Sequence, residues 1–207
     1  MNQPVSVSSF VLLRNNRITI DGKVAFELKD APAAKFLDAI YFYFEINYPK
    51  FFKMDNLCKT GFIAVELLMR ATSLKEILQP EETGIIFSNA NSSLDTDIRY
   101  EASLKTNPSP SLFVYTLPNI LIGELCIRHQ IKGESACFVF DIFDAQFQVG
   151  YINTLFKTGK IKRCLSGWAD YYNNEAEALF YLAEINVLNS SQLHNSSTIE
   201  KIYTKHE

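Results

Sequence analysis

The chain has 207 residues, of which 47% are apolar and 21% charged, and its formal net charge is −3. A mildly acidic chain lacks the basic field that neutralises phosphates, so nucleic acid is excluded as an expected partner. No segment approaches the roughly 18 apolar residues that span a bilayer, and the first nine residues have no signal-peptide pattern. We therefore expect a cytoplasmic protein with one domain over residues 1–188 and a polar, frayed tail over residues 189–207.

The N-terminal half of the sequence predicts strands first and helices second. Apolar alternation and turn residues predict a strand over 7–13 and a small hairpin over 17–28. Apolar residues at helical spacing then predict helices over about 30–48 and 54–72. The aromatic run at residues 41–44 fits either a core or a docking surface, because four consecutive rings cannot share one helix face. A short apolar strand over 84–88 follows, and the polar residues 89–97 are expected to be a loop.

The C-terminal half alternates strands and helices. We predict a helix over 117–131, a strand over 136–140, a helix over 145–158 that stops at Gly159, and strands over 163–169 and 179–188. Alternation at these spacings favours crossover connections and a mostly parallel sheet. The predicted fold class is α/β, a five-stranded sheet with helices on both faces plus the small N-terminal hairpin.

The sequence contains no standard signature of a metal, cofactor or hydrolase site. Its four cysteines are widely spaced, and the three histidines lie at 129, 194 and 206. His129 falls near the end of a predicted helix and is expected to be structural. Asp141 and Asp144 bracket a strand-to-helix connection, where at least one of them can cap the helix. We therefore predict no cofactor, no metal and no conventional catalytic group.

From residue 51 onward the sequence resembles the N-terminal half of β-ketoacyl synthases. The resemblance rests on an ordered set of short matches rather than on one motif: Phe-Phe-Lys-Met-Asp-Asn-Leu at 51–57, Thr-Gly-Ile-Ile-Phe-Ser at 83–88, Thr-Leu-Pro-Asn at 116–119, Gly123, Gly133, and Leu-Ser-Gly-Trp-Ala-Asp at 165–170. It implies a single half of a thiolase fold. The implied order of the five strands is third, second, first, fourth, fifth, with the last strand antiparallel.

The same resemblance implies that the nucleophile is missing. In active members the cysteine lies at the strand-to-helix elbow, nine positions beyond the glycine that matches Gly133, and that position is Ile142. An isoleucine has no nucleophilic atom, so Asp141, Ile142, Phe143 and Asp144 are predicted to form a degenerate elbow. The half of the family fold that carries the active-site histidines has no counterpart in this sequence.

Two functional hypotheses follow. The first is a non-catalytic ketosynthase-like protein, a partner of an active ketosynthase or an acyl carrier protein in fatty-acid, polyketide or polyene biosynthesis. The second is an acyl or small-ligand binding module that keeps only the fold. The candidate pocket or interface residues are Phe113, Asn119, Phe138, Val139 and Phe140. The family places strand 136–140 at a dimer edge, which implies a homodimer or a heterodimer through this uncharged strand.

Overall fold

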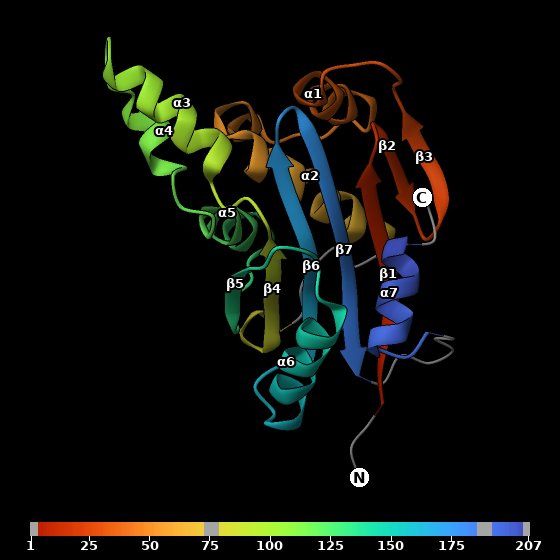
Figure 1. Ribbon diagram of the computed structural model, residues 1–207. Helices are drawn as coiled ribbons and strands as arrows, with labels where there is room; N and C mark the ends of the chain where they lie inside the picture. Colours follow the sequence, from red (N-terminus) through yellow and green to blue (C-terminus); the bar gives the residue numbers. More distant parts are fainter. Residues whose placement is uncertain (1–3, 73–78, 186–191, 205–207) are drawn as a thin grey trace.

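The computed structural model describes residues 4–72, 79–185 and 192–204. Within them the chain forms one seven-stranded sheet in the order β3-β2-β1-β7-β6-β4-β5 (Figure 1). The strands are β1 (Val5–Arg14), β2 (Arg17–Ile20), β3 (Lys23–Glu27), β4 (Thr83–Asn89), β5 (Ser135–Val139), β6 (Arg163–Tyr172) and β7 (Glu175–Ile185). The predicted α/β class is confirmed, and each predicted strand has a counterpart in this sheet.

Helices cover both faces of the sheet, and side chains that alternate along each strand divide between two cores. In β4, Ile85 and Phe87 join the core beneath α1 (Ala33–Tyr43), α2 (Asn56–Ala71) and α5 (Ile120–His129). Ile86, between them, joins the core beneath α6 (Ala145–Lys157) and α7 (Ser196–Thr204). β4 is buried on both faces along its whole length, which explains the continuous apolar run from Gly84 to Phe87 at its centre.

The first helical layer follows from local signals in the sequence. The Asp55 side chain accepts a hydrogen bond from the Cys58 backbone N–H (2.9 Å), which caps the start of α2. Before α2, the short 3-10 helix η1 (Pro49–Lys53) stacks the Phe51 ring on Tyr41 of α1, with ring centres 4.7 Å apart. In the aromatic run 41–44, Tyr41 is buried whereas Phe42 and Tyr43 are exposed, so the run serves the core only in part.

The predicted parallel character and strand order need correction. The sheet is mixed, because β4 pairs in parallel with β5 and β6 while the other neighbouring strands are antiparallel. The antiparallel direction of the last strand is confirmed. The predicted position of strand 7–13, which is β1, is wrong. This strand was expected between β4 and β6, but β4 and β6 pair directly with each other, from the pair Thr83 and Arg163 to the pair Ser88 and Trp168. Instead β1 pairs with the far side of β7.

Two helices were missed, for one physical reason. Residues 89–97 were expected to be a loop, but α3 (Leu94–Leu104) begins within them and packs loosely with α4 (Pro110–Val114). These two helices project from the main body (Figure 1). Thr96 is the buried residue of α3, and no residue of α4 is buried, so neither helix presents a continuous apolar face to the core.

The expected frayed tail is also wrong for residues 192–204. Its helix α7 buries Ile199 and Ile202 against the sheet, although polar residues surround them in the sequence. Residues ahead of α7 pair with β1, since the Val7 N–H donates to the Gln192 carbonyl (2.8 Å) and the His194 N–H donates to the Val5 carbonyl (3.0 Å). Residues 186–188 of the predicted last strand lie outside the described residues, and the domain division at 188 stays a prediction.

The edges of the sheet are protected unequally. β2 pairs with β1 only from Val11 onward. The first half of β1 is covered instead by residues 192–194 and by Asp21. The Asp21 side chain accepts a hydrogen bond from the Phe10 N–H (2.9 Å). At one end of the sheet, β3 carries Lys23 and Glu27. At the other end, β5 has no charged residue and no strand on its outer side within the described residues. An edge of this kind is open to pairing.

Candidate functional site

The connection from β5 to α6 lies at the carboxyl ends of the parallel strands. The Phe140 N–H donates to the Asn89 carbonyl (2.9 Å), which extends the pairing of β5 with β4 to this point. Asp141 and Ile142 then form a bend, and α6 begins at Ala145. Ile142 is 75% exposed, so its side chain points away from the core. Phe143 instead packs inward against the rings of Trp168 and Tyr203.

Asp144 is the residue that caps α6. Its carboxylate oxygen Oδ1 accepts a hydrogen bond from the Phe147 N–H (2.8 Å), which satisfies one of the free donors at the start of the helix. One turn later the buried Gln148 amide donates to the carbonyls of Ile86 (3.2 Å) and Gly167 (2.7 Å). These bonds fix the first turn of α6 on β4 and β6, so the elbow is held in one conformation.

Two of the predicted pocket or interface residues belong to an aromatic cluster beside the elbow. The Phe138 and Phe140 rings lie 6.1 Å apart, and both contact Phe147 at 4.9 and 4.8 Å respectively. Tyr151, one turn further along α6, contacts Phe138 at 5.1 Å. Val139, between the two phenylalanines, points to the opposite face of β5 and is 53% exposed. The alternation of the strand therefore places the rings under α6 and Val139 in solvent.

Phe113 and Asn119 do not join this cluster. Phe113 is an exposed residue of α4 whose ring contacts Tyr100 of α3 at 5.4 Å. Asn119 is the residue before α5, and its side chain makes no capping hydrogen bond there. The five predicted residues therefore fall into two groups, one at the β5 edge and one on the connection between α4 and α5.

None of the cysteines has the properties of a nucleophile. Burial raises the pKa of Cys137 to about 12 and the pKa of Cys164 further still. Burial also raises the pKa of Cys58 and of Cys126. Since the thiolate is the reactive form, all four side chains remain neutral thiols at pH 7.

The two described histidines are structural. Burial lowers the pKa of His129 to about 4, although the nearby Glu66 carboxylate opposes this shift. Burial likewise lowers the pKa of His194 to about 4, and its ring nitrogens lie 3.3 Å from the Tyr181 hydroxyl and 3.0 Å from Asn153 Oδ1. Both rings are neutral at pH 7. His194 is held by its two partners, whereas His129 Nε2 is buried 3.8 Å from Glu66 without a hydrogen bond.

One polar pair at the elbow end of the sheet was not singled out as a site from the sequence. Asp170, near the end of β6, accepts hydrogen bonds from the backbone N–H (3.1 Å) and the side-chain amide of Asn91. Burial raises the pKa of Asp170, while the bonds from Asn91 oppose that shift. The two residues are 79 positions apart, so no local pattern could have linked them. Their hydrogen bonds fix the loop after β4, which is a structural role.

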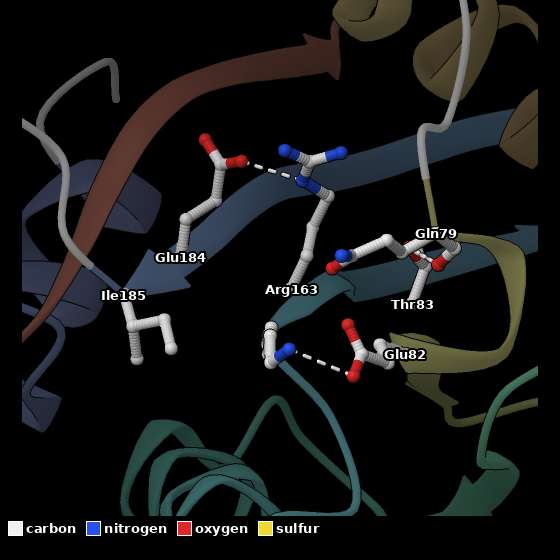
Figure 2. A pocket seen from close by; sticks show the side chains of 7 residues that line it. Gln79, Glu82, Thr83, Arg163, Glu184 and Ile185 are labelled. Atoms are coloured by element: carbon white, nitrogen blue, oxygen red, sulfur yellow. Dashed lines mark hydrogen bonds and ion pairs between the residues drawn. The ribbon is translucent and has the colours of Figure 1, made fainter.

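A cavity of about 300 Å³ lies at the opposite end of the sheet, where β4 and β6 begin and β7 ends. Two ion pairs line it: Lys162 with Glu82 (2.8 Å), and Arg163 with Glu184 (2.5 Å), which Figure 2 shows. Gln79, Thr83 and Ile185 complete the lining. Apolar atoms, mainly the aliphatic parts of these side chains, contribute more of the lining than polar atoms do, but an acyl chain that filled the cavity would take water away from the two ion pairs. It contains none of the residues predicted from the sequence.

Among the described residues, no helix combines the length and apolar composition needed to cross a membrane. The same residues contain no group of three His, Cys, Asp or Glu side chains arranged to hold a metal ion.

Sequence comparisons give no match, either to a protein-family model or to a curated protein. Structural comparison matches the ishigamide ketosynthase/chain length factor with a TM-score of 0.66 and 14% identity, over 91% of this chain and 64% of the other. It also matches a structure of a type II PKS acyl-carrier protein in complex with its ketosynthase bound to the hexaketide, with a TM-score of 0.64 and 16% identity, over 90% and 64% of the two chains.

A third match is a ketosynthase (ApeO) in complex with its chain length factor (ApeC) from Xenorhabdus doucetiae. Its TM-score is 0.59 at 12% identity, over 89% of this chain and 80% of the matched chain. The chain thus spans about 64% of the length of the first two matched chains. It has the thiolase-like fold that ketosynthases and chain length factors share.

Proposed function

We propose that this protein is a non-catalytic ketosynthase-like subunit that acts by pairing with an active ketosynthase or by binding an acyl carrier protein. The observation that carries this proposal is the elbow: its exposed residue is Ile142, and no side chain there can form a thioester. The pathway class that fits is polyketide, polyene or fatty-acid biosynthesis, in the cytoplasm. The matched ketosynthase and chain length factor structures support this class through their common fold.

The exposed edge of β5 supports a pairing role. Its backbone hydrogen-bonding groups face outward beside Val139, and no proline or charged residue within the strand discourages another strand. An antiparallel partner on this edge would extend the sheet across the interface. The aromatic cluster of Phe138, Phe140 and Phe147 lies behind the edge and would stiffen it.

The alternative function, an acyl or small-ligand binding module, would need an apolar cavity for a fatty chain. The cavity at the opposite end of the sheet is lined by two ion pairs, which an acyl chain would leave without water. The cavity does fit a polar ligand of similar volume, so the small-ligand form of the alternative function is the one that it supports.

Co-expression tests the pairing proposal. The chain would be expressed with a tagged ketosynthase encoded in the same genome, as the wild type, as Val139→Lys and as Val24→Lys. Val24 lies on β3 at the other end of the sheet and is 59% exposed, close to the 53% of Val139, so it is a matched control. We expect the wild type and Val24→Lys to co-purify in a stoichiometric complex and Val139→Lys to be lost. Equal recovery of all three chains would contradict pairing through β5.

A further inference from the structure

The cavity at the end of the sheet is built on a row of three side chains from neighbouring strands. Thr83 of β4 pairs with Arg163 of β6, and Arg163 in turn pairs with Glu184 of β7. Directly paired residues point their side chains to the same face of a sheet. All three residues line the cavity. The strand pairing therefore holds Arg163 and Glu184 side by side in a fixed position.

The ion pair between Arg163 and Glu184 leaves polar atoms unused. Arg163 donates through Nε to Glu184 Oε1 (2.5 Å). In the part of the chain that the structure describes, no hydrogen bond involves the two Nη nitrogens of Arg163 or the Oε2 oxygen of Glu184. None of these three atoms is buried away from solvent. They are therefore open to a ligand in the cavity.

The rest of the lining adds a second ion pair and an amide. Lys162 Nζ lies 2.8 Å from Glu82 Oε1. Figure 2 shows the side-chain amide of Gln79 pointing toward Arg163. The two ion pairs together contribute two cations and two anions, so the formal charges of the lining sum to zero.

The unused atoms of Arg163 and Glu184 indicate the chemistry of a ligand. The two Nη nitrogens of an arginine form a planar fork that donates two parallel hydrogen bonds to a carboxylate. Glu184 Oε2, beside this fork, can accept a hydrogen bond from an ammonium group. A ligand that carries both groups on one carbon adds no net charge to a lining whose charges already balance, so no buried charge is left without a partner.

The size and the apolar part of the cavity indicate the remainder of the ligand. A volume of about 300 Å³ is at the lower limit for ligand pockets, which suits a molecule of amino-acid size. Ile185 and the aliphatic stems of Arg163 and Lys162 offer apolar contacts. An aliphatic side chain fits against them. The ligand's own carboxylate and ammonium then replace the water that a simple acyl chain would remove from the ion pair of Arg163 and Glu184.

We propose that this cavity binds a free α-amino acid with an aliphatic side chain, its carboxylate on Arg163 and its ammonium on Glu184. The cavity lies at the end of the sheet opposite the elbow, and no residue of β5 lines it. The inference therefore goes beyond the pairing role proposed above, and each of the two can fail without the other.

Isothermal titration calorimetry of the wild-type chain tests the ligand class, with L-alanine, L-valine and L-leucine as probes. Two further probes keep the skeleton of leucine but lack one charged group: isocaproate has no ammonium, and isoamylamine has no carboxylate. We expect at least one of the amino acids to bind with one-to-one stoichiometry, and isocaproate and isoamylamine to bind at least about tenfold more weakly. The inference is overturned if no amino acid binds at up to about 10 mM, or if either single-charge probe binds equally well.

Variants of the ion pair test the assigned contacts. Arg163→Gln and Glu184→Gln should each weaken amino-acid binding at least about tenfold. Arg17→Gln is a matched control: Arg17 pairs with Glu27 across β2 and β3, and its Nη2 lies 2.7 Å from Glu27 Oε1, but neither residue lines the cavity. This control should bind as the wild type does, and circular dichroism would check that each variant is folded. Unchanged binding in Arg163→Gln and Glu184→Gln overturns the assigned contacts, and the probe series on the wild type decides the question if either variant does not fold.

Discussion

Arg128 of α5 donates two hydrogen bonds to the Glu66 carboxylate of α2, from Nε and Nη2, each 2.9 Å long. Burial would raise the pKa of Glu66, but the bonds and charge of Arg128 outweigh it and lower the pKa. This pair links the last turn of α5 to α2. The guanidinium of Arg128 therefore depends on a carboxylate buried in another helix.

Removing this carboxylate should destabilise the fold. Glu66 is 4% exposed, and Glu66→Ala would leave Arg128 without its main partner in a partly buried site. We expect a loss of about 3 kcal/mol in the free energy of unfolding, the usual cost of removing one member of a buried pair. Urea unfolding would measure it. The control Glu101→Ala, at an exposed position of α3, should change stability by less than about 0.5 kcal/mol; equal effects would refute the role of Glu66.

Gly167 should tolerate no side chain. An added Cβ would lie 1.7 Å from the Leu179 carbonyl oxygen, across the β6–β7 pairing, where neither backbone can move without breaking the sheet. Gly167→Ala should therefore cost at least about 3 kcal/mol or prevent folding. Gly150→Ala, in open space on α6, should instead stabilise the protein by about 0.5–1 kcal/mol. Thermal unfolding of the two variants would compare them, and similar melting temperatures would contradict the packing described.

The pH dependence of stability should reveal the buried His194. Burial lowers its pKa from 6.5 to about 4 in the folded state, so the unfolded chain binds the proton more readily between these values. Its contribution is fully present above pH 6.5 and is lost as the pH falls to 4, by up to about 3 kcal/mol. Unfolding measured from pH 7.5 to 4 should show a smaller loss for His194→Gln than for the wild type. Parallel curves would exclude the histidine as a source of the acid sensitivity.

The sequence predicted those parts of the fold that have a local signal. Alternating and apolar runs located the seven strands, and Asp144 was correctly anticipated as one of two candidates for the helix cap. The hairpin between β6 and β7 turns at Asn173 and Asn174, which both adopt positive φ, but the predicted strands stopped short of this turn. Both strands are consequently longer than expected.

What could not be predicted depends on contacts between distant residues. The position of β1 outside β7 is decided by the direct pairing of β4 with β6, which no local pattern records. The docking of α7 depends on Ile199 and Ile202 meeting the sheet across the chain.

A cysteine introduced at the elbow should be accessible but not catalytic. Ile142 is 75% exposed, and the carboxylates of Asp141 and Asp144 flank it, which disfavours a thiolate. His129 and His194 are both buried, and burial lowers the pKa of each to about 4, so neither is placed to serve as its base. We expect Ile142→Cys to be alkylated by iodoacetamide faster than any native cysteine, yet to gain no acyl group from an acyl carrier protein. Acyl transfer by this variant would show that the elbow retains catalytic function.

The central claim, that the chain is ketosynthase-like but non-catalytic, is tested most directly by intact-mass spectrometry. The wild-type protein would be incubated with acyl and malonyl carrier proteins, with an active ketosynthase as the positive control in a parallel reaction. We predict that the ketosynthase gains the mass of the acyl group while this chain keeps its original mass, because no side chain at residues 141–144 can form a thioester. A stoichiometric acyl adduct on this chain, or a condensation product formed by it alone, would contradict the claim.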